Sequence, residues 1–170
     1  MIQLLDYHAL NPQQLDQLSD IAVLPDQLIY SGDIASGLYM LVNTQSKDIR
    51  ALVWLVDDVP RGFMLLQRGA FLPPWAETDA ATLHAVQVDH RFQRRGLWTS
   101  CMRVLPAMLE ASWPEIRRLQ LSVDPLNQGA LACYRATGWV DSGTGFRTRN
   151  GYECQLSFVL PERAVNDAAP

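Results

Sequence analysis

The sequence AVQVDHRFQRRGLWTS, residues 85–100, decides the fold class of this chain. It reads as a short apolar strand, a basic turn that contains a glycine, and the start of an amphipathic helix. In that arrangement the backbone N–H groups of residues 94–99 and the positive end of the helix dipole face the same point. Gly96 lets a ligand approach the backbone closely, and Arg94 and Arg95 supply positive charge. The turn therefore predicts a phosphate-binding site.

A second motif, NQGALACYRATGW, occupies residues 127–139. Asn127 is a typical N-cap, and Gly138 is typical of the residue that ends a helix. Spacings of three and four residues place Ala130 and Tyr134 on the same helical face as Asn127. The motif predicts a short helix that presents a tyrosine on that face.

Together, the patterns Gln93-x-x-Gly96 and Asn127-x-x-Ala130-x-x-x-Tyr134-x-x-x-Gly138-Trp139 resemble the GNAT acetyltransferase superfamily, whose members move an acyl group from coenzyme A to an amine. The resemblance covers residues 83–139 well and the rest of the chain loosely. It implies a single α/β domain of the GNAT type, with a mixed central sheet of about six or seven strands flanked by about four helices. The element order read from the chain also predicts a mixed sheet with helices on both faces.

Local patterns predict the other elements of the fold. The expected strands are Ile2–Tyr7, Arg50–Val56, Gly62–Gln67, Thr82–Val88, Arg118–Val123 and two between Trp139 and Leu160, joined by a turn at Asn150-Gly151. The expected helices start at Asn11-Pro12, run from Ile34 to Val42, follow the basic turn to Ser112 with a kink at Pro106, and run from Asn127 to Thr137. A turn is expected at Asp57-Asp58-Val59-Pro60, and residues 24–37 are rich in turn signals. We expect one domain over residues 1–160 and a frayed tail over 161–170.

Composition limits the classes of function. The 170 residues are 48% hydrophobic and 19% charged, as in an ordinary globular domain, and the formal net charge is −4. An acidic chain disfavours general nucleic-acid binding, so the local basic turn stands out. No apolar run approaches the ~20 residues that span a bilayer. The three histidines and three cysteines lack metal-ligand spacing, so no metal is expected, and the unpaired cysteines favour a reducing, cytoplasmic location.

The resemblance implies that acetyl-CoA is the acyl donor and that the basic turn holds its pyrophosphate. The backbone of the preceding strand would pair with the pantetheine arm. The implied cofactor-binding residues are Val86, Val88, Gln93, Arg94, Arg95, Gly96, Leu97, Trp98, Thr99, Asn127 and Tyr134. Trp98 departs from the family, which usually has a small residue there, and its side chain would have to point away from the phosphates. The alternative interpretation of the turn is a solvated arginine cluster.

Two side chains are candidates for proton transfer. By its match to the family position, Tyr134 is the candidate general acid that protonates the departing thiolate, and the alternative is a core tyrosine. His84 is the candidate base because its unperturbed pKa is about 6.5. The stretch around His84 is similar to the arylalkylamine branch, where a second histidine often lies two residues earlier, but here Thr82 occupies that place. Glu77 and Asp79 are alternative bases or charges that attract the amine. The alternative interpretation of His84 is a histidine that is hydrogen-bonded at a strand end.

The sequence leaves the acceptor open. The loop Phe71–Glu77, with Pro73, Pro74 and Trp75, and the region Tyr30–Tyr39 are the candidate walls of an acceptor pocket. The main hypothesis is an N-acetyltransferase that acts on a primary amine in a ternary complex. We expect the acceptor to be a small molecule, with neither nucleic acid nor membrane as a partner, and a homodimer is one possible assembly. The alternative hypotheses are a non-catalytic module that binds or senses acyl-CoA, and a structural protein.

Overall fold

A seven-stranded mixed sheet in the order β1-β2-β3-β4-β5-β7-β6 forms the centre of the computed structural model, which describes residues 1–31, 34–148 and 151–162. The strands are β1 (Ile2–Asp6), β2 (Ile49–Val56), β3 (Val59–Gln67), β4 (Ala80–Val88), β5 (Arg118–Val123), β6 (Val140–Thr148) and β7 (Gly151–Val159). The α-helices are α1 (Pro12–Gln17), α2 (Pro25–Ser31), α3 (Ile34–Thr44), α4 (Leu97–Ser112) and α5 (Gln128–Ala136). The 3₁₀ turns η2 (Leu18–Asp20) and η4 (His90–Phe92) matter below. The predicted mixed α/β fold with a central sheet of about six or seven strands is confirmed.

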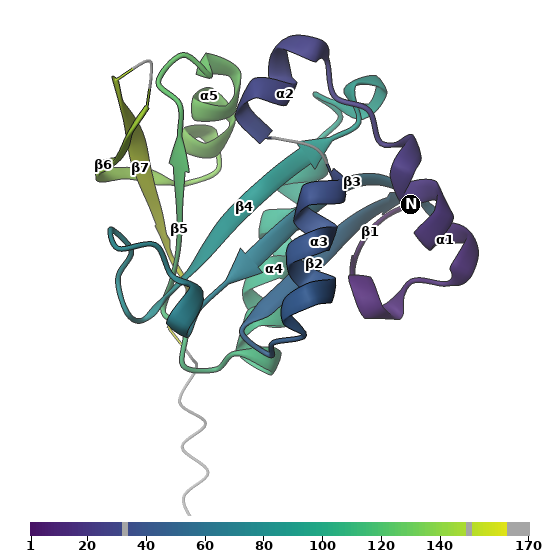
Figure 1. Cartoon of the computed structure of the whole chain (residues 1–170), viewed down its shortest axis with the longest axis horizontal. Helices are drawn as coiled ribbons and strands as arrows, with labels where there is room; N and C mark the ends of the chain where they lie inside the picture. The colour runs from purple at the N-terminus through teal and green to yellow at the C-terminus, as the bar shows by residue number, and fades with distance from the viewer. Residues whose placement is uncertain (32–33, 149–150, 163–170) are drawn as a thin grey trace, which may run out of the picture.

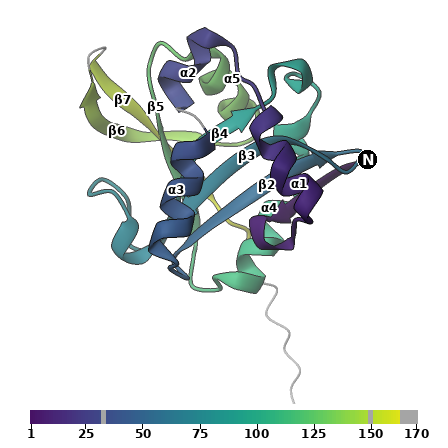
Figure 2. The ribbon, with the colours of Figure 1, turned by 45° about the vertical axis from the view of Figure 1, so that its right-hand side comes forward.

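Helices cover both faces of the sheet because its central strands are apolar on both sides. Along β2, Leu52 and Trp54 join the core under α4 and α5, while Val53 and Leu55 join the core under α1 and α3. This alternation follows from the two-residue period of a strand. Figures 1 and 2 show α1 and α3 on one face and α4 on the other. Each fully buried leucine of these cores contributes roughly 1.5–3 kcal/mol to folding.

The β4–β5 pair positions the functional site. It is the only parallel pair among the described strands, and its register ends where Thr82 faces Gln120. Beyond that point the two strands diverge toward α2 and α5 (Figure 1). On its other side β4 carries a bulge against β3, where Ala85 has a φ of 49°. A bulge of this kind bends a strand and redirects its side chains.

Helix ends follow the predicted capping chemistry. The Asn11 side chain accepts from the N–H of Gln14 and forms a capping box with it, and Pro12 begins α1. At α5, the Asn127 side chain accepts from the N–H of Ala130. Such caps satisfy N–H groups that have no partner inside the helix. α4 continues through Pro106 to Ser112 as predicted, and the kink expected at Pro106 stays a prediction.

Some predicted boundaries are wrong. α2 lies within the segment predicted to be turn-rich, because a seven-residue helix starting at Pro25 gives too short a periodic pattern to recognise. The turn between β2 and β3 consists of Asp57 and Asp58, both with positive φ, and β3 already begins at Val59. Pro60 fits inside the strand because the register shifts at its partner Leu55.

Other predictions fall partly or wholly on residues outside the description. The strands β6 and β7 pair antiparallel as predicted, with Thr148 opposite Gly151. Asn150, the first residue of the predicted hairpin turn, lies outside the described residues, and so do residues 163–170 of the predicted tail.

Candidate functional site

Two cavities open where β4 and β5 diverge. One, of about 520 Å³, is lined by α2, the end of β4, the start of α4, and α5. The other, of about 620 Å³, is lined by α2, the middle of β4, β5, α5 and the β6–β7 hairpin. The two cavities share a boundary, and the residues that line both are Tyr30, Ser31, Val86, Asn127, Ala130 and Tyr134. We call them the turn cavity and the hairpin cavity.

The basic turn has the backbone expected of an anion site. Arg94 has a φ of 58° and Gly96 a φ of 78°, both in the left-handed region. Gly96 is the N-cap of α4 but supplies no side-chain cap, so the first N–H groups of the helix receive no side-chain acceptor from that position. A Cβ placed on Gly96 would meet no atom within 4 Å, which shows that space beside this turn is open. Uncapped N–H groups and the helix dipole together favour a negatively charged ligand in that space.

The turn cavity gathers nearly all of the predicted cofactor residues. Its lining includes Val86, Val88, Gln93, Arg94, Gly96, Leu97, Trp98, Thr99, Asn127 and Tyr134. Arg95 is the exception, because its guanidinium group lies 5.0 Å from the centre of the Phe92 ring and the residue does not line the cavity. Gln93 lines the cavity, but its side chain is already used, since its Nε2 donates to the carbonyl of Val88 at 3.0 Å.

The bulky Trp98 side chain packs into the protein core. It is 7% exposed, and its indole N–H donates to the hydroxyl of Thr137 at 2.8 Å. Its ring lies 4.9 Å from that of Tyr134 and 6.1 Å from that of Trp139. Trp98 therefore anchors α4 to α5, and its bulk does not obstruct the backbone of the turn.

His84 lines the hairpin cavity, and Thr82 holds one of its ring nitrogens. Its Nε2 lies 2.8 Å from the hydroxyl oxygen of Thr82, which in turn lies 3.4 Å from the carbonyl oxygen of Gln67. If the Thr82 hydroxyl donates to Gln67, it accepts from the Nε2–H of His84, which leaves the Nδ1 lone pair to take a proton. Burial lowers the pKa of His84 from its ordinary value of about 6.5 to about 4, so the ring is neutral at pH 7.

Tyr134 is almost completely buried between aromatic rings and lines both cavities. Burial raises the pKa of its phenol well above the ordinary value of 10, and the nearby Cys133 and Cys101 thiols act in the same direction. The phenol therefore keeps its proton at neutral pH. In chemical terms it can donate a proton but cannot serve as a base there.

The structure does not bring Glu77 and Asp79 to either cavity. Both carboxylates pair with Arg118, at 2.6 Å and 2.9 Å, where β4 and β5 begin. This lies at the opposite end of β4 from α2 and α5 (Figure 1). The loop with Pro73, Pro74 and Trp75 is also absent from both linings, so the predicted acceptor wall at that loop is not found there.

α2 lines both cavities, and two of its lining residues, Gln27 and Ile29, lie outside the regions that the sequence predicted. Tyr30 and Ser31 line both cavities, Ile29 lines the hairpin cavity, and Gln27 lines the turn cavity. Only Tyr30 and Ser31 fall within the region Tyr30–Tyr39 that was predicted to contribute to an acceptor pocket. α2 has no buried residue. Its sequence therefore has no buried apolar face whose pattern could have indicated where the helix packs.

The described part of the chain has no group of three or more histidine, cysteine, aspartate or glutamate residues arranged to hold a metal ion. No helix in residues 1–31, 34–148 or 151–162 is long and apolar enough to cross a bilayer.

Comparisons with known proteins agree with this fold. A model described as the acetyltransferase (GNAT) family matches residues 13–139. The fold resembles the ribosomal-protein-S18-alanine N-acetyltransferase from Escherichia coli, with 18% identity, a TM-score of 0.64 and 98% of each chain covered. It also resembles the aminoglycoside acetyltransferase AAC(6')-Ib in complex with coenzyme A and kanamycin, with 16% identity, a TM-score of 0.70, and 94% of this chain and 95% of that chain covered.

A third similar structure is the GNAT domain of S. lividans PAT, with 17% identity, a TM-score of 0.69, and 94% of this chain and 90% of that chain covered. A search of curated protein sequences finds no match. At these identities the structural likeness shows only that the folds are similar. It does not extend to the side chains that line the two cavities.

Proposed function

Because the chain belongs to the acetyltransferase (GNAT) family, we propose that it transfers an acetyl group from acetyl-CoA to a primary amine, without a covalent enzyme intermediate. The observation that carries this proposal is that two cavities share a boundary, which includes Val86 and Tyr134. A two-substrate transfer needs a donor site and an acceptor site that share the point of reaction. The turn cavity is the proposed donor site, and the hairpin cavity is the proposed acceptor site.

The donor site is supported by the chemistry of its two ends. At one end, the N–H groups of residues 97–99 and the charge of Arg94 suit the pyrophosphate. Toward the other end, β4 has lost its β5 partner beyond Thr82, so its backbone is open to hydrogen bonding by the amide-rich pantetheine arm. The carbonyl of Val88 already accepts from Gln93, so Val86 is the better candidate for that contact.

In the proposed reaction, the amine nitrogen forms a bond to the thioester carbon as the carbon–sulfur bond breaks. The Nδ1 of His84 takes the proton that the amine loses, while Thr82 holds the opposite ring nitrogen. Tyr134 gives its phenolic proton to the departing sulfur, which leaves coenzyme A as a thiol. A backbone N–H of β4 that hydrogen-bonds the thioester oxygen would stabilise the charge that develops there.

The acceptor is proposed to be a small molecule with a primary amine. The hairpin cavity, at about 620 Å³, falls within the range of small-molecule sites. The neighbouring structures include an aminoglycoside acetyltransferase with kanamycin and an enzyme named for a ribosomal protein, so the fold accommodates both classes of acceptor. The proposed location is cytoplasmic, which fits the free thiols of Cys101, Cys133 and Cys154.

Calorimetric titration with acetyl-CoA tests the donor site. Gly96→Asp adds a negative charge beside the uncapped N–H groups and should weaken binding roughly tenfold or more. The matched control is Gly96→Asn, which has the same shape, tolerates positive φ similarly and adds no charge. If the wild-type protein binds acetyl-CoA and both variants bind it equally weakly, the cause is backbone strain at residue 96. Equal, undiminished affinity in all three proteins would remove the pyrophosphate from this turn.

A further inference from the structure

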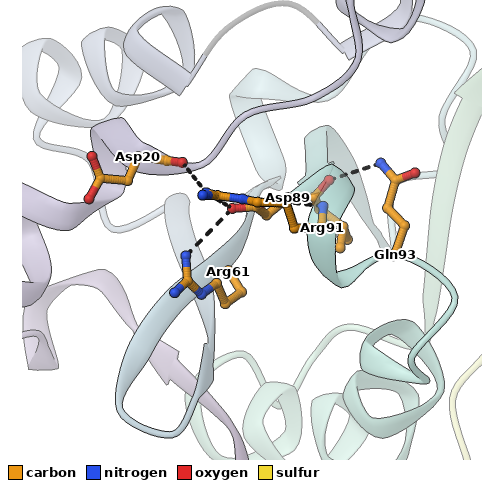
Figure 3. Close-up of polar contacts among 6 residues, drawn as sticks. Asp20, Arg61, Asp89, Arg91 and Gln93 are labelled. Carbon is orange, nitrogen blue, oxygen red and sulfur yellow. Dashed lines mark hydrogen bonds and ion pairs between the residues drawn. The ribbon is translucent and has the colours of Figure 1, made fainter.

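A buried carboxylate lies directly before the basic turn. Asp89 follows the last residue of β4 and is 0% exposed. It accepts hydrogen bonds from the backbone N–H of Arg91 at 3.0 Å and from Nε of the same residue at 2.8 Å, and Arg91 Nη2 completes the ion pair. Nη1 of Arg61 lies 3.6 Å away on the other side (Figure 3). Burial opposes ionisation of Asp89, but Arg91 and Arg61 outweigh it and lower the pKa of the carboxyl below its ordinary value.

The same two arginines connect Asp89 to segments that are distant in sequence. Nη2 of Arg91 also donates to the carbonyl of Asp20 at 2.9 Å, at the end of η2 (Figure 3). Beside this contact, the backbone N–H of His90 donates to the carbonyl of Ala22 at 2.8 Å. On the β3 side, the N–H of Asp89 donates to the carbonyl of Arg61 at 2.8 Å. The residues that lead into the basic turn are therefore fastened both to the η2–α2 segment and to β3.

A second hydrogen-bonded contact lies closer to the turn. The amide groups of Gln93 and Gln27 lie within hydrogen-bonding distance in both directions, at 2.8 Å and 3.2 Å. Nε2 of Gln93 also reaches the carbonyl of Val88, so it joins the end of β4 to α2. Gln93 immediately precedes Arg94, whose backbone has positive φ. The hydrogen bonds that fix the position of Gln93 therefore also restrict the position of the turn that follows it.

Such a network specifies position more than it stabilises the fold. A buried ion pair loses much of its Coulomb energy to desolvation, whereas an apolar replacement of similar size would often fold equally well. Its hydrogen bonds, however, have fixed directions and lengths. An anion-binding turn requires such control, because its N–H groups must converge on one point.

We propose that Asp89 and Arg91 are positioning residues that set the phosphate-binding turn by locking residues 89–93 to η2, α2 and β3. Neither residue touches the phosphates in this account. Arg91 and Asp89 are both absent from the lining of the turn cavity, so they act through the backbone that they hold. This inference rests on the proposed function, because it takes the pyrophosphate of coenzyme A as the ligand of the turn.

Asp89→Asn tests the proposal when its affinities for two ligands, coenzyme A and pantetheine, are compared with those of the wild-type protein. It removes the charge that Arg91 and Arg61 share while keeping the shape of the side chain. We expect the affinity for coenzyme A, measured by calorimetry at a temperature where the variant is folded, to fall roughly 10- to 100-fold. The affinity for pantetheine, which lacks every phosphate, should change less than twofold in an NMR titration. Equal losses for both ligands would contradict a specific effect on the turn.

Two further variants distinguish an effect on the position of the turn from an effect on the stability of the fold. Asp48 and Arg68 form an ion pair of 2.8 Å, and neither residue lines a cavity. Asp48→Asn breaks this ion pair. It should lower the melting temperature without changing the affinity for coenzyme A. Arg91→Lys keeps the charge at a half-exposed site, so it should fold even if Asp89→Asn does not. A lysine cannot span Asp89 and the Asp20 carbonyl as the guanidinium does, so affinity for coenzyme A should still fall.

The outcomes are distinct. Full affinity for coenzyme A in Arg91→Lys and Asp89→Asn, with wild-type binding intact, would overturn the positioning role and leave the proposed function standing. Absence of coenzyme A binding in the wild-type protein would overturn the proposed function and, with it, this inference. A loss in Asp48→Asn as large as that in Asp89→Asn would mean that general destabilisation is the cause, and would also overturn it.

Discussion

The ring of Trp98 meets the ring of Tyr134 nearly edge to face, with centroids 4.9 Å apart and planes inclined by 83°. One residue belongs to the first turn of α4, beside the basic turn, and the other to α5, at the junction of the two cavities. The contact joins the proposed pyrophosphate site to the proposed proton donor. It also explains how a tryptophan fits where the family usually has a small residue.

Trp98→Ala should lower the free energy of unfolding by about 3–5 kcal/mol, the range for removing a buried aromatic side chain. The reason is the loss of its ring contacts and of its hydrogen bond to Thr137. Urea unfolding of wild type and variant measures the difference. Trp98→Phe, which keeps an aromatic ring without the N–H, should lose less. A Trp98→Ala protein as stable as wild type would mean that the indole is not an anchor.

Tyr134→Phe should reduce turnover by about 10²- to 10⁴-fold, the usual contribution of a general acid or base. The substitution keeps the ring that packs against Trp98 and removes only the phenolic proton. Because that proton is used only in the transfer step, calorimetric affinity for acetyl-CoA should be unchanged. Steady-state kinetics on one accepted amine provides the rate. A variant that turns over at the wild-type rate would assign Tyr134 a purely structural role.

The pH–rate profile should have an acidic limb that belongs to His84. The amine itself must be neutral to attack, so kcat/KM should rise with pH up to the pKa of the amine. If the neutral ring of His84 takes the proton, this rise should be steeper below about 4, the lowered pKa of this histidine. His84→Gln should lower the rate and abolish this steeper acidic limb only. Persistence of that limb in the variant would remove His84 from the mechanism.

The stability of the protein should also depend on His84. Its folded-state pKa, about 4, lies below the unfolded value near 6.5, so the unfolded state binds more protons between these values. The free energy of unfolding should therefore fall as pH decreases from about 6.5 to 4, by on the order of 1–3 kcal/mol from this group. Urea unfolding at several pH values should show a smaller decrease in His84→Gln. Parallel curves for the two proteins would mean that His84 is not buried as described.

The predictable part of the fold is encoded locally. The basic turn follows from the glycine and arginines at 94–96, the caps at Asn11 and Asn127 from side chains that reach their own helix, and the strands from apolar alternation. Each of these signals involves residues only a few positions apart. For this reason the basic turn and the tyrosine helix could be recognised from the sequence.

The remainder depends on contacts between distant residues. α2 has no buried side chain, and its position follows from hydrogen bonds such as that between Gln27 and Gln93, which are 66 residues apart. The pKa of His84 depends on burial by surrounding elements, so its sequence neighbours do not reveal it. Glu77 and Asp79 were plausible bases by sequence proximity, but Arg118 on the neighbouring strand holds them at the other end of β4.

The most direct test of acetyl transfer is to incubate the protein with acetyl-CoA and a panel of primary amines, and to measure free thiol and acetylated product together. The panel should include aliphatic and aromatic monoamines, diamines, an aminoglycoside and a peptide with a free N-terminus. We predict that at least one small amine gives equimolar coenzyme A and acetylated amine, at a rate that falls by about 10²-fold or more in Tyr134→Phe. Tight binding of acetyl-CoA without thiol release for any amine would contradict the account and favour a module that only binds acyl-CoA.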